Sequence, residues 1–276
     1  MSIRAKKSLG QHFLRSKTAL REMIEAAAIN NGELVLEIGP GEGVLTQELL
    51  VAGGRVIAVE TDERCIMLLR ERFRDEIETK QLTLLVGDIR AEKTIRELFN
   101  TKNLGTKTYK LVANIPYYIT GMLFRLFLEK LRQPSIIVFL VQKEVAEEII
   151  SRDGKEGILS LSVKAYGNPR YVSKVKKEAF SPPPKVDSAI LSIVDINRER
   201  VSRALEKKYF AIIKAGLGSR RKMLFGNLTR AFPEIKSKIE ESFNTLQIDK
   251  GVRGEDLSHR EWLKLVQILP EISDRK

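Results

Sequence analysis

The sequence predicts an α/β fold, with a doubly wound and mostly parallel sheet followed by a small all-α C-terminal domain. Two observations support this prediction. Short apolar runs alternate with helix-like segments over the first two thirds of the chain, a pattern typical of a parallel sheet covered by helices on both faces. From about Asn197 onward the periodicity is helical throughout. We therefore expect a larger domain over 1–196 and a helical domain over 197–276.

The elements of the larger domain follow from periodicity and from glycine positions. Leu20, Met23, Ile24 and Ala27 recur at helical spacing before Gly32. Buried strands are predicted at Glu33–Ile38, Arg55–Val59, Leu82–Val86, Tyr109–Ala113 and Ser135–Val141. The helices predicted between them include Val44–Leu50 and Glu63–Arg74. Crossovers between parallel strands should be right-handed.

The pattern changes after Gly157. A helix is predicted at Ile158–Tyr166, and two further strands at Tyr171–Lys176 and Ser188–Val194. Between these strands, the prolines at 182–184 cannot continue a helix or an inner strand, so they predict a stiff loop. The C-terminal helices are predicted to include Val201–Ala215, Arg220–Ala231 and Glu234–Phe243.

Composition limits the class of protein. The chain is 43% hydrophobic and 30% charged, which is typical of a soluble globular protein. No apolar run approaches the roughly 18 residues that would span a bilayer, and the basic N-terminus lacks the apolar stretch of a secretory signal. The lone Cys65 excludes an internal disulfide and a cysteine-rich metal site. We expect a cytoplasmic protein without a metal and without a membrane partner.

The net charge of +12 is concentrated at the two ends. Residues 1–21 carry +6 and residues 198–276 carry +7, whereas residues 22–197 carry −1. A neutral body with basic flanks is typical of a protein that grips a polyanion. Solubility alone explains the charge equally well. An anionic membrane is a weaker alternative, since neither end shows a strongly amphipathic basic helix.

A glycine-rich turn follows the first predicted strand. Residues 37–43 are E-I-G-P-G-E-G, and glycine lets the backbone turn sharply and approach a ligand. The spacing G-x-G-x-G differs from the dinucleotide pattern G-x-G-x-x-G, which disfavours an oxidoreductase. No GK[ST] phosphate loop is present, which argues against ATP. By itself this turn could be purely structural.

Acidic residues at two further strand ends favour a ligand. Glu60 ends the second strand 21 residues after Gly39, where a nucleotide-binding fold places a carboxylate for the ribose hydroxyls. Asp88 follows the third strand, where it could accept from an adenine amino group or cap a helix. Because the carboxyl ends of parallel strands share one edge of the sheet, the three features together predict a site for an adenosyl ligand.

The fourth strand leads into Asn114-Ile115-Pro116-Tyr117, a sequence suited to chemistry on the amine of a nucleobase. That nitrogen is planar and poorly nucleophilic because its lone pair is delocalised into the ring. The Asn114 side-chain oxygen and the Ile115 carbonyl could accept its two hydrogens and free the lone pair. Pro116 should hold Ile115 extended.

Two aromatic residues could hold the base after it leaves its stack. Removing a base from its stack in the RNA costs a few kcal/mol. Stacking of the base on an aromatic side chain recovers about 1–3 kcal/mol of this cost. Tyr117 offers one flat face, and Phe180, just before the proline loop, is the candidate for the opposite wall. An ordinary turn at 114–117 and an ordinary core role for Phe180 are the alternative. Transfer by in-line displacement would need positioning and desolvation rather than a metal.

The chain resembles the KsgA/RsmA family of ribosomal RNA adenine dimethyltransferases over nearly its whole length. The matching segments are K-S-L-G-Q-H-F-L at 7–14, E-I-G-P-G-E-G-V-L-T at 37–46, A-N-I-P-Y-Y-I-T at 113–120, Q-K-E-V-A-E at 142–147 and F-S-P-P-P-K-V-D-S-A at 180–189. The resemblance implies a Rossmann-like fold dependent on S-adenosylmethionine (SAM). It also implies dimethylation of two adjacent adenines in the loop of the 3′-terminal helix of small-subunit rRNA, within the immature small ribosomal subunit. The sequence does not give the oligomeric state, for which a monomer is the default expectation.

The resemblance also implies roles for individual residues. SAM would be contacted by His12, Leu14, Gly39, Glu60, Asp88 and Asn114, and the adenine pocket would be formed by Asn114, Tyr117 and Phe180. Two positions depart from the commonest pattern, because His12 and Tyr118 stand where the family often has Asn.

The segment G-S-R-R-K-M-L at 218–224 also matches the family. Arg220, Arg221 and Lys222 are expected at a helix start, where basic residues oppose the helix dipole. Contact with rRNA phosphates would explain them, and a solvated face is the alternative.

Two rival functions remain. A resistance-type methylase that modifies an adenine of large-subunit rRNA shares the N-I-P-Y motif, but R-R-K-M-L at 220–224 and R-G-E-D-L-S at 253–258 resemble KsgA. The other rival is a non-catalytic RNA-binding, assembly or transcription factor, although nothing in Asn114–Tyr117 looks degenerate.

Overall fold

The computed structural model describes residues 3, 5–6, 10–219 and 221–272. The chain forms two compact units, the first comprising 1–146 and 169–196, the second 147–168 and 197–276. The second unit takes in 147–168, which the predicted division into 1–196 and 197–276 places in the larger domain, so the predicted domains stay a prediction.

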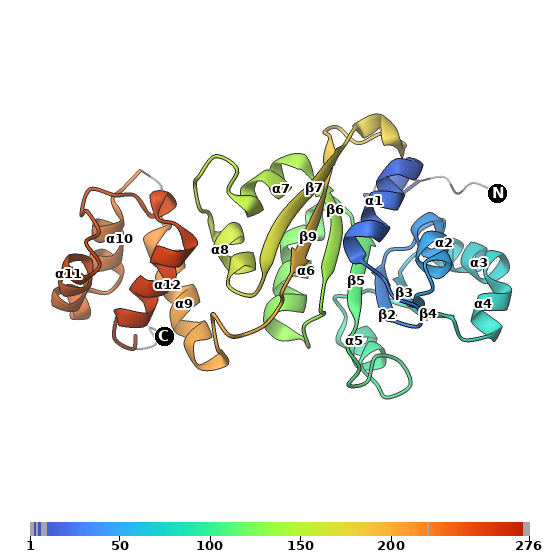
Figure 1. Ribbon diagram of the computed structural model, residues 1–276, viewed down its shortest axis with the longest axis horizontal. Helices are drawn as coiled ribbons and strands as arrows, with labels where there is room; N and C mark the ends of the chain where they lie inside the picture. Colours follow the sequence, from blue (N-terminus) through green and yellow to red (C-terminus); the bar gives the residue numbers. More distant parts are fainter. Residues whose placement is uncertain (1–2, 4, 7–9, 220, 273–276) are drawn as a thin grey trace. The chain divides into compact units, whose positions relative to one another are not determined.

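The first unit is built on a seven-stranded sheet with the strand order β4-β3-β2-β5-β6-β9-β7 (Figure 1). The pairs β4–β3, β3–β2, β2–β5 and β5–β6 are parallel, and β9 is antiparallel to β6. The predicted α/β class with a mostly parallel sheet is confirmed. The strands are β2 (Leu34–Ile38), β3 (Arg55–Glu60), β4 (Leu82–Val86), β5 (Lys110–Asn114), β6 (Ile137–Gln142), β7 (Asn168–Val175) and β9 (Ser188–Val194).

Helices cover both faces of this sheet. On one face, buried side chains of α1, α2 and α3 join those of the strands in a single hydrophobic cluster that includes Met23, Leu49 and Val138. Phe139, the next residue of β6, points to the opposite face and packs on Phe124 of α6, with ring centroids 5.2 Å apart. These elements are α1 (Lys17–Ala27), α2 (Val44–Val51), α3 (Glu63–Arg72), α4 (Arg74–Glu78), α5 (Glu92–Leu98), η2 (Tyr117–Ile119), α6 (Thr120–Arg125) and the π-helical turn η3 (Leu126–Lys130).

The helix predicted over Glu63–Arg74 is broken at Phe73. Its ring is fully buried, and a Cβ added to Gly43 would lie 2.6 Å from it. Phe73 leaves helical geometry at φ −116° and ψ 37°, and α4 starts at the next residue. Tertiary packing beneath the glycine turn thus overrides a helical pattern that continues through this position.

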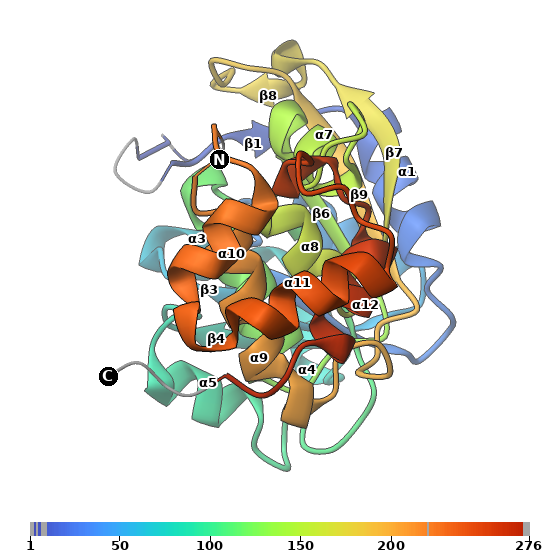
Figure 2. The same ribbon diagram turned by 90° about the vertical axis from the view of Figure 1, so that its left-hand side faces the viewer.

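The second unit contains helices joined by short turns (Figure 2). Its core holds Trp262, Tyr209 and Phe243, all fully buried. No helix in the described part of the chain is long and apolar enough to cross a membrane. The helices are α8 (Ile158–Lys164), α9 (Arg203–Gly216), α10 (Leu224–Ala231), α11 (Lys236–Thr245) and α12 (His259–Ile268), with α7 (Lys143–Ile150) spanning the division between the units.

The helix start predicted at Arg220 is wrong, because α10 begins at Leu224. The Asn227 side chain donates to the carbonyls of Gly216 and Ser219, at 2.8 and 3.1 Å. The Lys222 amide donates to the Ser219 carbonyl, at 3.0 Å, and Arg221 lies in a turn rather than in the helix. The described bases of that segment therefore precede the helix rather than occupy its first turn.

Candidate active site

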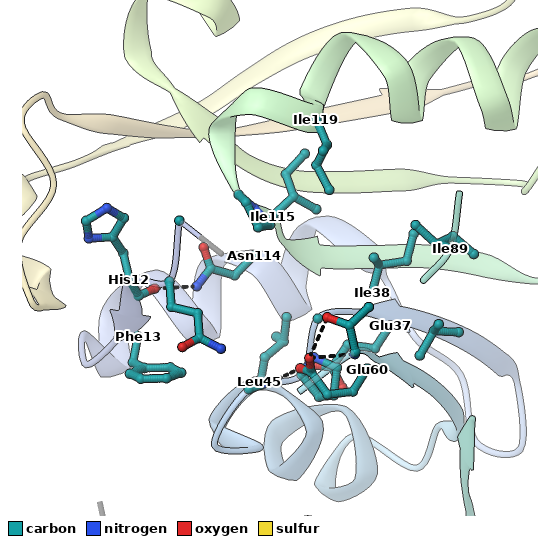
Figure 3. Close-up of a pocket in the computed structure, with 18 of the residues that line it drawn as sticks. His12, Phe13, Glu37, Ile38, Leu45, Glu60, Ile89, Asn114, Ile115 and Ile119 are labelled. Carbon is teal, nitrogen blue, oxygen red and sulfur yellow. Dashed lines mark hydrogen bonds between the residues drawn. The ribbon is translucent and has the colours of Figure 1, made fainter. Parts of the chain in front are cut away.

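A cavity opens in the first unit at the carboxyl ends of β2, β3, β4 and β5 (Figure 3). The sheet order reverses between β2 and β5, and open α/β sheets bind ligands at such switch points. The cavity lining includes all ten residues predicted for cofactor and base: His12, Leu14, Gly39, Glu60, Asp88, Asn114, Ile115, Pro116, Tyr117 and Phe180.

The glycine-rich turn forms one wall of the cavity. Gly39 has φ +69° and Gly41 φ +57°, which side chains rarely adopt. A Cβ added to Gly39 would meet no atom within 4 Å, whereas one added to Gly41 would lie 3.0 Å from the Phe13 ring. The turn therefore leaves open space beside Gly39 and packs closely against the N-terminal segment at Gly41.

Glu60 joins two of the turns that line the cavity. Its side chain is buried and accepts hydrogen bonds from the amides of Gly41, Thr61 and Asp62, at 3.0, 2.7 and 2.9 Å. The Thr61 hydroxyl is also 3.5 Å from Oε1, which accepts from Thr61 and Asp62, whereas in the described part of the chain the donor to Oε2 is the Gly41 amide. A carboxylate oxygen has about two acceptor sites, so Oε2 can accept from a further donor. The position suits the predicted ribose contact and also holds the glycine turn in place.

Asp88 is engaged by its own loop. The Arg90 amide and guanidinium donate to its carboxylate, with Nε 2.9 Å from both oxygens. The hydrogen bond from Arg90 is the main reason that the pKa of Asp88 is lowered. A third of the Asp88 side chain remains exposed, so the predicted contact with an adenine amine would share this carboxylate with Arg90.

The N-terminal segment closes another side of the cavity. β1 (Phe13–Leu14) pairs antiparallel with β8 (Phe180–Ser181), with Leu14 opposite Phe180. The Nδ1–H of His12 donates to the carbonyl of Pro182, at 2.8 Å. β8 follows η4 (Lys177–Ala179) and leads into the predicted proline loop. Residues 12–14 and 180–182 are far apart in sequence, but these contacts bring them together as one wall of the cavity.

Asn114 is held in a defined orientation by this wall. Its Nδ2 donates to the main-chain carbonyl of His12, at 3.2 Å, and Figure 3 draws the amide oxygen on the other side of the group. Since a carbonyl can only accept, the bond fixes which end of the amide carries nitrogen. Oδ1 is then available as an acceptor for a ligand, as the sequence analysis requires.

The two predicted aromatic residues lie differently. Tyr117 is half-buried, and its hydroxyl is 2.6 Å from the Ser188 hydroxyl. The His12 ring stacks beside it, with centroids 6.2 Å apart and planes inclined by 20°. Phe180 is 4% exposed and belongs to the hydrophobic core cluster as well as to the cavity lining. Phe180 therefore packs in the core and also lines the cavity, and its contact with a base stays a prediction.

Several polar residues around the cavity make contacts that the sequence did not predict. Gln11 Nε2 donates to Asp62 at 3.1 Å, and Arg15 pairs with Glu42 at 2.6 Å. Both contacts tie the N-terminal segment to the loops after β2 and β3. Two sequence features could have predicted these contacts. One is the G-Q-H-F-L motif near the N-terminus, and the other is the pair of acidic residues at 42 and 62 beside the predicted ligand-binding turns.

Glu37 is a second buried carboxyl at the cavity. Burial raises its pKa to about 8, opposed by a hydrogen bond from Thr46, and the nearby charge of Glu60 raises it further. The Thr46 hydroxyl lies 2.6 Å from Oε2. Glu37 therefore keeps its proton at neutral pH and can donate as well as accept.

The protonated Glu37 predicts a pH-dependent stability. Its unfolded pKa is about 4.5, so its stabilising contribution is complete below that pH and is lost as pH rises toward 8. The slope is at most about 1.4 kcal/mol per pH unit. We expect Glu37→Gln, which mimics the protonated form, to gain stability relative to the wild type as pH rises from 5 to 8. Thermal unfolding across this range measures the difference, with the exposed Glu48→Gln as control. A difference that stays constant with pH would contradict the assignment.

Of the predicted RNA-binding bases, Arg221 and Lys222 belong to the second unit, where they are exposed in the turn before α10. Arg220 falls outside the described residues. Arg221 and Lys222 therefore do not lie in the first turn of a helix, as the sequence predicted, and their contact with phosphates stays a prediction.

Solved structures share this architecture. The 23S rRNA methyltransferase ErmE aligns with a TM-score of 0.74 and 24% identity, covering 93% of this chain and 99% of that one. A dimethyladenosine transferase from Plasmodium falciparum aligns with a TM-score of 0.73 and 24% identity, covering 92% and 96%. At such identities the likeness concerns the fold. The chain therefore has the Rossmann-like fold of methyltransferases.

Sequence relatives narrow this class. The family model described as "Ribosomal RNA adenine dimethylase" matches residues 2–271. Proteins named ribosomal RNA small subunit methyltransferase A are 43% identical in Dehalococcoides mccartyi strain BAV1, covering 96% of this chain and 88% of that one, and 35% identical in Fusobacterium nucleatum, covering 97% and 98%. The chain belongs to the ribosomal RNA adenine dimethylase family, as the sequence motifs predicted.

Proposed function

We propose that this enzyme transfers methyl groups from SAM to N6 of two adjacent adenines in the loop of the 3′-terminal helix of small-subunit rRNA. It is an rRNA adenine dimethyltransferase by family, and its relatives are named for the small subunit. The observation that carries the chemistry is the Asn114 amide, whose nitrogen is engaged by His12. Its oxygen is thereby left for the substrate.

In the proposed mechanism, Asn114 Oδ1 and the Ile115 carbonyl accept hydrogen bonds from the two N–H groups of the adenine N6 amine. This contact favours a tetrahedral nitrogen, whose lone pair is free to attack. Fixed acceptors need no reorganisation during the reaction, which is why such groups lower a barrier effectively. Tyr117 and Phe180 hold the base between them in a water-poor position. Pro116 restricts the backbone that carries the Ile115 carbonyl.

The residues at the glycine turn fit SAM. The open space beside Gly39 admits a ligand close to the backbone, Glu60 retains acceptor capacity for ribose hydroxyls, and Asp88 would accept from the adenine amine. His12 and Leu14 would lie toward the methionine end. When bound, SAM supplies an electrophilic methyl group on a sulfonium, so the proposed transfer requires no metal.

Replacing Glu60 by Gln tests the cofactor site by a binding measurement that does not depend on enzymatic activity. The amide has the size of the carboxylate but carries no charge, and its NH₂ would face one of the three backbone donors. Hydrogen bonds to charged groups contribute about 1.5–3 kcal/mol, so SAM affinity should fall about 10- to 100-fold. Isothermal calorimetry measures this, with the exposed Glu63→Gln as the matched control. Equal affinity in both variants would remove Glu60 from the site.

Mass spectrometry of rRNA tests the function as a whole. Purified small-subunit and large-subunit particles lacking the modification are incubated separately with the enzyme and SAM. We expect two adjacent N6,N6-dimethyladenosines in small-subunit rRNA only. Label confined to large-subunit rRNA would favour the resistance-type activity. SAM binding with no transfer to either particle would favour a non-catalytic assembly factor.

The proposed partner is the immature small ribosomal subunit, bound by a monomer in the cytoplasm. Arg220, Arg221 and Lys222 would contact rRNA phosphates without reading sequence. Such contacts weaken with salt, so their replacement should reduce the salt dependence of particle binding. The net charge of +7 over residues 198–276 supports this assignment.

A further inference from the structure

Tyr118 is a solvent-exposed aromatic residue at the cavity. It is 62% exposed and lines the cavity beside Pro116 and Tyr117. Among the described Phe, Tyr and Trp residues, no other is exposed to this degree. The proposed mechanism gives this ring no role, and the fold buries little of it.

Local geometry directs this ring away from the core. Residues 117–119 form the 3-10 turn η2, in which successive side chains are rotated by about 120°. Tyr117 therefore points toward Ser188, to which its hydroxyl is bonded, while Tyr118 turns outward. The chain packs against one edge of the outward ring, since a Cβ added to Gly10 would lie 3.4 Å from Tyr118 Cε1. The ring is thus supported on one side and open on the rest.

A cation also lines the cavity. Arg90 is half-exposed and forms an ion pair with Asp88, so its charge is largely balanced within the protein. An exposed aromatic face at the mouth of a cavity is suited to stacking on a nucleobase.

We propose that Tyr118 stacks on the nucleobase next to the target adenine and thereby positions the RNA strand at the cavity mouth. This inference rests on the proposed function, since it presumes that a base enters the cavity. Tyr118 would be a positioning residue, because it would touch the neighbouring nucleotide rather than the reacting nitrogen. Any base could occupy this face, since stacking is tolerant of sequence.

Steady-state kinetics on small-subunit particles tests the stacking role. We expect Tyr118→Ala and Tyr118→Leu to raise KM for the particle about tenfold, with kcat within about twofold of the wild type. Tyr118→Phe keeps the flat ring and should behave as the wild type. Leu is the matched control for apolar bulk without a π face. SAM affinity by calorimetry should be the same in all four proteins.

The outcomes separate this proposal from the proposed function. A wild type that methylates no particle would overturn both. An active wild type with an unchanged KM in Tyr118→Leu would overturn the stacking role alone. A fall in kcat at unchanged KM would place Tyr118 against the target base instead.

A fluorescent base identifies the occupant directly. With 2-aminopurine in place of the nucleotide next to the target, binding to the wild type should quench its emission through stacking. Tyr118→Ala should bind the same RNA at saturating concentration without this quenching. Equal quenching by both proteins would overturn the assignment.

Discussion

Asn114→Ala is expected to lower kcat for methyl transfer by about 10²–10³-fold while leaving binding of the small-subunit particle nearly unchanged. Removing one fixed hydrogen-bonding partner of a reacting group has effects of this size. The change deletes the oxygen proposed to accept an N6 hydrogen and also the donor to the His12 carbonyl. Single-turnover transfer at saturating SAM and particle measures the chemical step.

Two further variants serve as controls for the effect of Asn114→Ala on turnover. In Asn103→Ala the deleted amide also donates to a main-chain carbonyl, that of Glu97, but away from the cavity. It should retain full turnover. In Asn114→Asp an acceptor remains but the hydrogen for His12 is lost, so we expect intermediate activity. Turnover of Asn114→Ala equal to that of Asn103→Ala would refute the proposed mechanism.

Trp262→Ala is expected to destabilise the second unit by about 3–5 kcal/mol, the usual cost of truncating a large buried aromatic residue. The indole is fully buried, and its Nε1 donates to the Gly254 carbonyl at 3.0 Å. A Cβ added to Gly216 would lie 2.4 Å from the ring, which shows how closely α9 approaches it. Urea unfolding followed by circular dichroism measures the loss.

The controls come from the same helix and the same position. Ile268→Ala removes a side chain of α12 that is 42% exposed, and should cost far less. Trp262→Phe keeps a ring but loses the indole hydrogen bond, so its cost should be intermediate. A midpoint for Trp262→Ala equal to that of Ile268→Ala would show that the packing around the indole contributes little.

Much of the fold could be predicted from local sequence. Alternating apolar runs and helical segments located the strands of the central sheet to within a few residues, and β4 and β9 were located at both ends. The wrong predictions at Phe73 and at the start of α10 share a cause. In both places the end or start of a helix is set by a contact outside the local pattern, between Phe73 and Gly43 in one case and between Asn227 and the carbonyls of Gly216 and Ser219 in the other. Local periodicity contains no such information.

Which residues line the cavity could be predicted from the sequence, but their hydrogen bonds could not. Strand ends converge on one edge of a parallel sheet, so Gly39, Glu60 and Asn114 were expected together. The bond between Asn114 and His12 joins residues 102 positions apart, and no spacing rule supplies it. The engagement of Asp88 by Arg90 is local, yet Arg90 could equally have faced solvent. The hydrogen-bond partners of the site residues therefore became known only from the structure.

The carboxylate at the end of β3 has one more consequence. Since the amides of Gly41, Thr61 and Asp62 all donate to Glu60, the loops after β2 and β3 are held together by hydrogen bonds within the protein. Few loop residues then have to become ordered when a ligand binds, so the entropic cost of binding is smaller. We therefore expect SAM to bind a largely preformed site with little conformational change.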